Sequence, residues 1–579
     1  MASLIRVNMT DATVSISTTP IKYRKMGGRG LTSNLVFDEV NPECHPLGIN
    51  NKLIFAPGIV TGTAAPSSGR ISVGAKSPLT GGIKESNSGT PFSQSLARLG
   101  YQAIVIEGQA QKKGEFHLLK ISKDGAELIK ATELQGKGAY ETISILNEKY
   151  KEHDICCIGP AGEKRMSMAG ICFNDPEYRA SRYSGRGGLG AVMGSKGLKA
   201  IVVEKGGSIL SPLTDDLFKS GQKKLVDGLR SHDVTKPGGA LNSFGTAVLI
   251  NILNQAGGLP TRNFSAGVFE GAEQISGEHL AETVKERGGA GMTGHACHPG
   301  CVVRCSNVYP RPDGSDHVSC IEYESAWALG ANLGVDDLDQ VAEMIRICND
   351  IGVDTIEAGV ALGVAMEAGL AEFGDGEAAI GLLEEIGKGS PLGHILGNGA
   401  GFTGKAFGVT RVPVVKNQGM PAYEPRAVKG IGITYITSTM GADHTAGYTI
   451  APEILGVGGK LDPLDPEGKI ELSRIFQAVT AFVDSAGYCL FTTFATTDIP
   501  SANEGMIETV NAVLGTDYDS DDTIALGLEI LRLERTFNER AGFTNKDDRP
   551  PEFMRHEKLP PHNHVYDVPD EALDEVWNF

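Results

Sequence analysis

Three evenly spaced cysteines are the first candidates for chemistry in this chain. Cys297, Cys301 and Cys305 form a C-x3-C-x3-C run with glycine and proline between them, HACHPGCVVRC. Thiolates at this spacing can point at one centre, and this number of soft ligands is typical of an iron–sulfur cluster or of zinc. Zinc sites use C-x2-C pairs more often, and radical S-adenosylmethionine enzymes use C-x3-C-x2-C. The alternative is three packed cysteines without a metal, and a cluster would need a fourth ligand from elsewhere.

Two predicted helix ends share one pattern. Residues 349–354 (NDIGVD) close one helix, and residues 484–489 (DSAGYC) close another. Glycine past a helix end is an ordinary C-cap, but a carboxylate there faces the negative end of the helix dipole, at a cost of up to about 1 kcal/mol. We expect the three carboxylates of these segments to accept hydrogen bonds from N–H groups of a ligand with two similar halves. Cys489, which ends the second copy, is then the natural fourth cluster ligand.

A glycine-rich segment, RYSGRGGLGAVMGSKGLKAIVV, begins at Arg182 and suits a phosphate group. It is one residue short of a P-loop and lacks the G-x-G-x-x-G spacing of a dinucleotide fold. Arg182 and Arg186 nevertheless stand among backbone N–H groups that can bind anions; the alternative is a surface turn before a strand. A similar Gly/Ser/Asn loop, KESNSGT (84–90), contains Asn87, and Arg70 lies shortly before it.

Two further polar segments complete the candidates. Glu322 and Glu324, in EYES, precede an apolar helix, and His444 lies in GADHT. A carboxylate near a helix start is usually a cap, and a lone histidine is usually structural. Neither segment by itself indicates a catalytic role.

The elements that must position these residues change in type along the chain. Residues 1 to about 205 hold runs such as LIRVN, KLIFAP, AIVIEG and AIVVEK, broken by Gly, Pro and Ser at short intervals. Such runs predict strands, with helices at 91–99 and 140–150. From about residue 212 the apolar period becomes helical. The sequence therefore predicts an α+β fold without a fixed-period repeat. The predicted domains are 1–207, 208–411 and 412–579.

Two helix faces and a glycine-rich break support this division. The faces are Leu338, Val341, Ile345 and Cys348, capped by Asp336 or Asp337, and Leu472, Ile475, Val479 and Phe482. The break at 388–408 suggests the boundary near 410. We expect the Pro-rich and charged tail from Asn545 to wrap the surface.

Composition narrows the class of protein. The 579 residues carry 53 Lys and Arg against 71 Asp and Glu, a net charge of −18, so the chain repels a phosphate backbone and we expect no nucleic acid as partner. No secretory signal and no stretch of about 18 apolar residues is evident, which predicts a cytoplasmic protein without a membrane partner and with reduced thiols. The 75 glycines, about 13% against a usual 7%, require the backbone to turn tightly or approach something closely.

Together these segments resemble the tungsten-containing aldehyde:ferredoxin oxidoreductase family over nearly the whole chain. The most specific are SGRGGLGAVMGSKGLKAIVV, SPLTG…SNSG (77–89), EYESAWALGANLG (322–334), APEILG (451–456) and DSAGYCLFTTF (484–494). The resemblance implies a first domain of two β-sheets forming a base for the pterin cofactor, followed by two mainly α-helical domains. It also implies tungsten held by two pterins (tungstopterin), one [4Fe–4S] cluster, and magnesium bridging the pterin phosphates.

The resemblance also implies a role for particular residues. Cys297, Cys301, Cys305 and Cys489 would hold the cluster, with Arg70 between cluster and pterin. Asn87 and Tyr183 would bind magnesium through backbone oxygens, and Gly89, Arg182, Gly185 and Arg186 would line the phosphates. Asn349, Val353 and Asp354 would hold one pterin, and Asp484, Tyr488 and Leu490 the other. Glu324 and His444 match the family's pair near the metal.

Four departures from the family pattern bear on these roles. One extra residue separates Cys297 from Cys301, and Asn349 stands where the motif usually begins with Asp. Ala446 replaces a lysine that can bind phosphate. The longer loop RASRYSG leaves open whether Arg179 or Arg182 contacts the pterin.

The expected activity is oxidation of aldehydes to carboxylic acids with water, with Glu324 activating the water and His444 bonding the aldehyde oxygen. Two electrons would pass through pterin and cluster to ferredoxin or an iron–sulfur partner subunit. The alternatives are a family member with another substrate, such as aryl thioester or carboxylate reduction, a radical S-adenosylmethionine enzyme, and a structural zinc or electron-transfer subunit. Whether the chain forms a homo-oligomer is left open.

Overall fold

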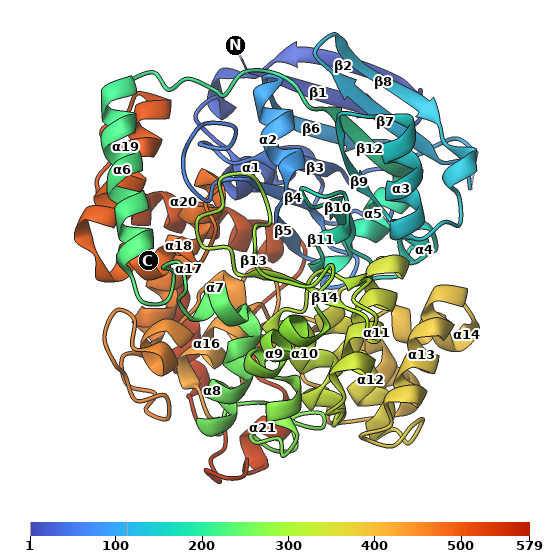
Figure 1. Cartoon of the computed structure of the whole chain (residues 1–579), viewed down its shortest axis with the longest axis vertical. Coiled ribbons are helices and arrows are strands. Elements are labelled where there is room, and N and C mark those ends of the chain that lie inside the picture. Colours follow the sequence, from blue (N-terminus) through green and yellow to red (C-terminus); the bar gives the residue numbers. More distant parts are fainter. Residues whose placement is uncertain (1, 113, 579) are drawn as a thin grey trace.

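Two six-stranded β-sheets dominate the first 205 residues and confirm the predicted α+β class. The computed structural model describes residues 2–112 and 114–578, and in Figure 1 the sheets lie at the top with most helices below them. The first sheet contains β1 (Ser3–Asn8), β2 (Thr13–Thr18), β3 (Leu53–Pro57), β4 (Arg70–Lys76), β5 (Ile83–Gly89) and β6 (Tyr101–Glu107). The second contains β7 (His117–Ser122), β8 (Gly125–Lys130), β9 (His153–Cys157), β10 (Ile171–Asn174), β11 (Ala180–Ser184) and β12 (Leu198–Glu204).

The two sheets repeat one topology, although the sequence shows no fixed-period repeat. The first has the order β2-β1-β6-β3-β4-β5, and the second, from its opposite edge, has β8-β7-β12-β9-β10-β11. One pair in each is parallel, β1 with β6 and β7 with β12, and the other neighbours are antiparallel. Connections of unequal length hide the repeat: residues 19–52 in the first half correspond to 131–152 in the second.

Helices fill equivalent connections of the two halves. The predicted helices at 91–99 and 140–150 are confirmed as α2 (Pro91–Arg98) and α3 (Ala139–Lys149). Their counterparts α5 (Leu189–Lys196) and α1 (Gly28–Glu39), and the short α4 (Pro160–Glu163), were not predicted. The glycines of α5 hide its helical pattern in the sequence. They serve close packing, since a Cβ at Gly194 would lie 2.0 Å from the Gly162 carbonyl oxygen.

Three segments predicted as loops or breaks are regular structure. KESNSGT (84–90) belongs largely to β5, because its polar residues face the interior. Residues 182–197 end β11 and form α5, and they are almost wholly buried, so this is no surface turn. The break at 388–408 holds two helices, α14 (Pro391–Gly397) and α15 (Ala400–Phe407).

The remainder of the chain is mainly helical, as predicted. A small sheet carries the cysteine segment, formed by β13 (Met292–His295), β14 (Ser306–Pro310) and β15 (Asp316–Val318), and β16 (Val414–Val415) pairs with β17 (Gln418–Gly419). The helices up to residue 410 are α6 (Asp215–Ser231), α7 (Ala240–Phe244), α8 (Leu249–Gln255), α9 (Gly277–Arg287), α10 (Tyr323–Leu329), α11 (Leu338–Ile351), α12 (Thr355–Glu367), α13 (Gly376–Lys388), α14 and α15. Those beyond are α16 (Lys429–Thr437), α17 (Lys469–Ala486), α18 (Thr492–Asp498), α19 (Pro500–Leu514), α20 (Ser520–Arg540), α21 (Glu552–His556) and α22 (Asp570–Asp574).

Both predicted helices are confirmed, but only one of the two predicted faces is buried throughout. The α11 face is buried, and Asp337 caps the helix by accepting from two backbone N–H groups. In α17, Phe482 is buried but Ile475 is 38% exposed. The buried side of this helix includes polar residues: Ser473 Oγ lies 2.7 Å from Thr434 Oγ1 of α16, and Gln477 donates to Thr437 at 3.0 Å.

The C-terminal tail packs deeper than expected. Tyr566 and Val568 are fully buried, and α21 and α22 lie within this segment. Across residues 2–112 and 114–578, no helix combines the length and the apolar character that a membrane crossing requires.

The ends of α11 and α17 are docked on the base. Gly352 and Gly487 have φ of +78° and +92°, so each helix closes with a left-handed glycine. The backbone continues into the base: Gly170 N–H donates to the Gly352 carbonyl at 3.0 Å, and Val60 N–H donates to the Ala486 carbonyl at 2.9 Å. Both matched motifs thus face the same surface of the base.

Candidate cofactor and active site

A cavity of about 380 Å³ lies where the base meets the helical domains. Its lining includes every predicted site residue except Tyr488, whose hydroxyl is buried elsewhere, 2.5 Å from Thr509 Oγ1. Arg182 lines the cavity, whereas Arg179 pairs with Asp175 and Asp316 outside it. Of these two arginines, only Arg182 can reach a ligand in the cavity.

The four predicted cluster cysteines come together through one serine of the base. The Ser67 N–H donates to the Gly300 carbonyl at 2.9 Å, and its hydroxyl accepts from Val302 N–H at 3.0 Å, which holds the 297–305 segment. The Ser67 carbonyl accepts from Cys489 N–H at 2.9 Å. Three backbone and hydroxyl contacts of a single residue therefore join two cysteine segments that are far apart in sequence.

The thiols are electrostatically unequal. A hydrogen bond from Cys301 and the neighbouring His298 ring hold the pKa of Cys297 well below its usual range. The Nδ1 atom of His298 lies 3.1 Å from Cys297 Sγ. Burial raises the pKa of Cys489, against the opposing charge of Arg70. Four cysteines line one cavity, and four thiols form a donor set suited to an iron–sulfur cluster.

Gly89 separates Arg70 from the cysteines. A Cβ at this position would lie 3.0 Å from both Arg70 Nη1 and Cys297 Sγ, which is tighter than ordinary contact. Arg70 Nε donates to the Asn87 side chain on the same sheet. The arginine is thereby held beside the thiols, where its charge can balance theirs.

The first helix end holds Asp354 differently from the sequence expectation. Asp354 caps the following helix α12 by accepting from Ile356 N–H at 3.1 Å, so it faces a favourable dipole end. Its other oxygen accepts from Arg186 Nε at 3.1 Å. Asp350, grouped with it in the sequence, instead accepts from Tyr140 N–H of the base at 3.2 Å. Both carboxylates therefore have protein partners, and of the two Asp354 lines the cavity.

Asp484 at the second helix end retains the predicted setting. It lies in the last turn of α17 and lines the cavity, with Arg29 Nη1 3.6 Å away. Burial and the nearby Glu85 raise the pKa of Asp484 to about 8. At neutral pH this carboxyl is largely protonated and can both donate and accept a hydrogen bond.

Glu324 and His444 face each other across the helical side of the cavity. Glu324 Oε1 and His444 Nδ1 are 3.4 Å apart, and neither buried atom has a hydrogen bond within the described residues. Glu324 Oε2 accepts from Ala422 N–H at 2.9 Å. Burial raises the pKa of Glu324 to about 8 and lowers the pKa of His444 to about 4. Two aimed but unsatisfied polar atoms indicate a place for a reacting group.

Two cations from the base hold the segment that carries His444. Arg186 Nη1 donates to the Ala442 carbonyl at 2.6 Å, and the buried Lys84 Nζ lies 3.2 Å from Asp443 Oδ2. Arg186 also donates to the Gly419 carbonyl at 2.6 Å. The guanidinium expected to face phosphate is thus largely used by the protein to join all three predicted domains.

Sequence reasoning missed the residues that hold the site rather than line it. Lys84 belonged to a segment predicted as a loop, Ser67 has no motif, and Glu534, the partner of Arg29, sits in a long amphipathic helix. The segment 83–89, IKESNSG, shows no alternating strand pattern, because Ile83 is its one apolar residue. The others depend on contacts between residues hundreds of positions apart.

The lining fits a large polar cofactor beside a metal cluster. Several buried polar atoms of lining residues have no partner in the described chain. They are Glu85 Oε1, Ser181 Oγ, Arg182 Nε, Glu324 Oε1 and His444 Nδ1. A Cβ at Gly185 would enter open space, with nothing nearer than 3.8 Å, so a ligand can approach this backbone closely.

Comparison with known proteins agrees with this arrangement. Residues 4–205 match the family model "Aldehyde ferredoxin oxidoreductase, N-terminal domain", and residues 221–579 match "Aldehyde ferredoxin oxidoreductase, domains 2 & 3". The tungsten-containing aldehyde ferredoxin oxidoreductase of Pyrococcus furiosus is 37% identical, over 96% of this chain and 91% of that protein. The protein of the same description from Thermococcus kodakarensis gives the same values.

Two more distant similarities carry other descriptions. The WOR-like subunit of an aliphatic sulfonate oxidoreductase from Pyrococcus furiosus is 27% identical over 92% of this chain and 85% of that protein. The active-site complex BamBC of benzoyl coenzyme A reductase has the same fold, with a TM-score of 0.79 and 20% identity over 99% of this chain and 93% of that chain. With both family models and close relatives spanning nearly its whole length, this chain belongs to the aldehyde ferredoxin oxidoreductase family.

Proposed function

We propose that this enzyme oxidises aldehydes to carboxylic acids. Aldehyde and water give the acid, two protons and two electrons, so the site must remove protons and pass on electrons. The observation that carries the proposal is the Glu324–His444 pair, with its two unsatisfied atoms 3.4 Å apart in a cavity that four thiols also line. The close relatives that are described as tungsten-containing aldehyde ferredoxin oxidoreductases support it.

The cavity would hold a tungsten bis-pterin beside a [4Fe–4S] cluster. When bound, the tungsten centre supplies the two-electron oxidising power that no side chain has. Asn349, Val353 and Asp354 would hold one pterin, Asp484 and Leu490 would contact the other, and the backbone oxygens of Asn87 and Tyr183 would hold magnesium at the phosphates. Tyr488 would act through its backbone only, since its side chain lies outside the cavity.

Glu324 would be the base that takes a proton from water. Its buried carboxyl has a pKa raised to about 8, which is close to the range in which proton transfer at neutral pH is efficient. Ala422 N–H fixes one oxygen at 2.9 Å, so the other is left for the reacting water. Glu324 belongs to the start of helix α10 and not to the N-terminal β-sheet domain.

His444 would bond the aldehyde oxygen as charge develops on it. Burial lowers the pKa of His444 to about 4, so the ring is neutral at pH 7 and can donate one N–H without carrying a charge of its own. The Ala442–Asp443 segment, held by Arg186 and Lys84, fixes where the ring lies.

Electrons would leave through the cluster held by Cys297, Cys301, Cys305 and Cys489, with ferredoxin or an iron–sulfur partner subunit as acceptor. Arg70 lies beside these thiols and the pterin end at Gly89, so its charge would favour the reduced cluster. The radical S-adenosylmethionine alternative is wrong for this family and fold, since an antiparallel pair of short strands and then helices, rather than repeated βα units, follow Cys305.

The decisive experiment combines elemental analysis of protein produced anaerobically with tungstate and a kinetic comparison with a variant of Glu324, the proposed general base. We expect about one tungsten and about four irons per chain, and aldehyde-dependent reduction of an electron acceptor. Glu324→Gln should keep both metals and lose about 100-fold to 10,000-fold in kcat. Zinc without tungsten or iron would refute the cofactor proposal, and full turnover of a tungsten-replete Glu324→Gln enzyme would refute the base.

A further inference from the structure

His298 directly follows Cys297, in the stretch that is one residue longer than the family pattern, and its side chain is completely buried. The ring joins two parts of the chain. Its Nε2 atom accepts a hydrogen bond from Gly69 N–H of the base at 3.0 Å, and its Nδ1 atom lies 3.1 Å from Cys297 Sγ. The ring thus stands between the N-terminal β-sheet domain and a proposed ligand of the cluster.

Gly69 gives the ring of His298 its place. A Cβ at Gly69 would lie 2.3 Å from Cδ2 and 2.4 Å from Cγ of the histidine, so any side chain at this position would displace the ring. The backbone of His298 is held as well, because its carbonyl accepts from Cys301 N–H at 3.2 Å. Contacts to the ring and to the backbone together keep His298 beside Cys297.

The hydrogen bond from Gly69 decides which nitrogen of His298 carries the proton. A backbone N–H can only donate, so Nε2 must be the unprotonated nitrogen that accepts it. A neutral imidazole has one N–H, which is therefore at Nδ1. This N–H faces Cys297 Sγ, and the sulfur is the acceptor. The hydrogen-bond network thereby fixes a donor towards the sulfur.

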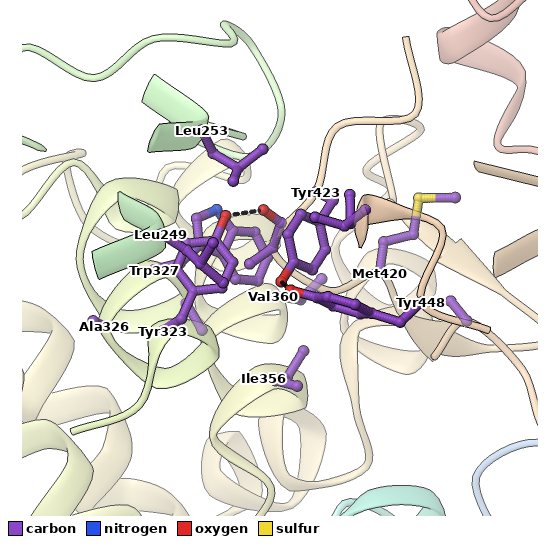
Figure 2. Packing of buried hydrophobic residues seen from close by; sticks show 14 of the residues in the cluster. Leu249, Leu253, Tyr323, Ala326, Trp327, Ile356, Val360, Met420, Tyr423 and Tyr448 are labelled. Carbon is purple, nitrogen blue, oxygen red and sulfur yellow. Dashed lines mark hydrogen bonds between the residues drawn. The ribbon is translucent and has the colours of Figure 1, made fainter. Parts of the chain in front are cut away.

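His444, the histidine of the proposed reacting pair, differs in this respect. Its ring lies 6.1 and 6.4 Å from the rings of Tyr423 and Tyr448, whose hydroxyls hydrogen-bond each other, as Figure 2 shows. The Nδ1 atom of His444 has no hydrogen bond within the described residues, which leaves it for a reacting group. Both nitrogens of His298 are used by the protein, so this ring is suited to act on the sulfur it touches.

Hydrogen bonds to ligand sulfurs are one of the means by which a protein sets the reduction potential of an iron–sulfur cluster. A donor draws electron density from the thiolate, so it stabilises the reduced cluster, which carries one more negative charge. At Cys301 the donor is a backbone group, Arg304 N–H, 3.3 Å from Sγ, which a side-chain substitution leaves in place. At Cys297 the donor is the side chain of His298, so here the potential depends on the type of residue.

We propose that His298 is a positioning residue of the cluster site, whose Nδ1–H donates to Cys297 Sγ and raises the reduction potential of the cluster. The inference rests on the cluster of the proposed function and adds a residue to it. A higher potential lets the cluster take up electrons from the substrate site more readily. The longer spacing between Cys297 and Cys301 then has a purpose, because it contains the residue that bonds the sulfur.

Asparagine and glutamine each reproduce one half of the imidazole, so two variants separate its two hydrogen bonds. In His298→Asn the amide nitrogen can take the place of Nδ1 and donate to Cys297, but the side chain is too short to accept from Gly69. In His298→Gln the amide oxygen can take the place of Nε2 and accept from Gly69, but no N–H remains where Nδ1 stood. Each variant is therefore the matched control of the other.

The test is an EPR-monitored redox titration of anaerobic protein that carries about four irons per chain. In His298→Gln the equilibrium constant for one-electron reduction of the cluster should fall about threefold or more relative to wild type, a shift of about 28 mV to lower potential. In His298→Asn the constant should stay within about 1.5-fold of wild type. An unchanged potential in His298→Gln, or an equal fall in both variants, would overturn the proposal.

A measurement on the wild-type protein makes the test independent of how the variants fold. Pulsed EPR of the reduced cluster, in protein labelled with ¹⁵N at histidine Nδ1, should show a ¹⁵N coupling, and its absence would overturn the proposal even if neither variant binds iron. Failure of the proposed function looks different. Wild-type protein without a cluster would refute the cofactor proposal and this inference with it. A cluster with the expected coupling, in protein that oxidises no aldehyde, would refute the activity and support the role of His298.

Discussion

At the scale of single residues, Glu324 and His444 lie in surroundings that disfavour their charged forms and leave one polar atom of each without a hydrogen bond in the described chain. Glu324 and His444 are buried among tyrosines, so each is pushed towards its neutral form, with pKa values near 8 and 4. Neither finds a partner for its inner atom within the described chain. A neutral imidazole and a carboxyl that is close to neutral, 3.4 Å apart, can both hydrogen-bond a reacting group without two opposite charges having to form between them.

The raised pKa of Glu324 predicts a pH-dependent stability of the cofactor-free protein. Because its folded pKa of about 8 lies above the usual 4.5, the folded state holds this proton more tightly. The resulting stabilisation is full below pH 4.5 and is lost as pH rises through 8. Glu324→Gln stays neutral at every pH, so its Tm relative to wild type should climb between pH 5 and pH 9 in differential scanning calorimetry.

A surface carboxylate supplies the control for this measurement. Glu571 is exposed near the C-terminus, and Glu571→Gln should show a constant Tm difference from wild type over the same pH range. A flat difference for Glu324→Gln as well would mean that Glu324 ionises freely in the fold, and its assignment as a buried base would lose its electrostatic support.

At the scale of elements, two glycine contacts set how the helix ends meet the base. A Cβ at Gly58 would lie 2.1 Å from the Gly487 Cα and 2.6 Å from the Ala486 carbonyl oxygen. On the other half, a Cβ at Gly159 would lie 2.4 Å from the Ile351 carbonyl oxygen. These close approaches bring Asp484 and Asp354 to the cavity floor, and they explain part of the glycine excess.

Gly58→Ala should therefore loosen the end of α17. The added methyl group overlaps backbone, which cannot rotate away, so we expect a loss of about 1–3 kcal/mol of unfolding free energy or more. Iron per chain should fall too, because Cys489 lies two residues beyond Gly487.

Gly381→Ala is the matched control: its Cβ meets no atom within 4 Å in α13, so its free energy of unfolding should rise by about 0.5–1 kcal/mol and it should keep its iron. Normal iron and stability in Gly58→Ala would contradict the packing argument.

The sequence predicted the site better than the elements that hold it. The cysteines and the two helix ends follow from short motifs, the Glu324–His444 pair follows from the family resemblance, and residues of all of them line one cavity. The strand β5, the helices α1 and α5 and the buried face of α17 were missed, because glycine and polar residues there serve close packing and buried hydrogen bonds. The duplicated sheet topology was invisible, since connection lengths differ between the halves.

At the scale of the whole molecule, buried ions of the base anchor the helical domains. Arg29 of α1 donates Nε and Nη2 to the Glu534 carboxylate of α20 at 2.9 and 2.8 Å, across 505 positions of sequence. The hydroxyls of Ser33 and Thr439 donate to the same carboxylate at 2.8 and 2.6 Å. The same guanidinium faces the cavity, 3.6 Å from Asp484. One residue therefore links overall stability to the place proposed for the second pterin.

Removing one partner of the Arg29–Glu534 ion pair should lower the free energy of unfolding more than removing both partners. Glu534→Gln leaves the Arg29 charge buried without its partner, so unfolding free energy should fall by about 3–5 kcal/mol. Glu534→Gln combined with Arg29→Met removes both charges and should recover more than half of that loss. Pterin per chain should nevertheless stay low in the double variant, because the guanidinium that lines the cavity beside Asp484 is gone. Glu539→Gln, on the exposed face of α20 and paired with Arg535, should lie within about 0.5 kcal/mol of wild type. Urea unfolding midpoints and pterin content measure both effects, and a double variant less stable than Glu534→Gln alone would show that Arg29 stabilises the fold independently of Glu534.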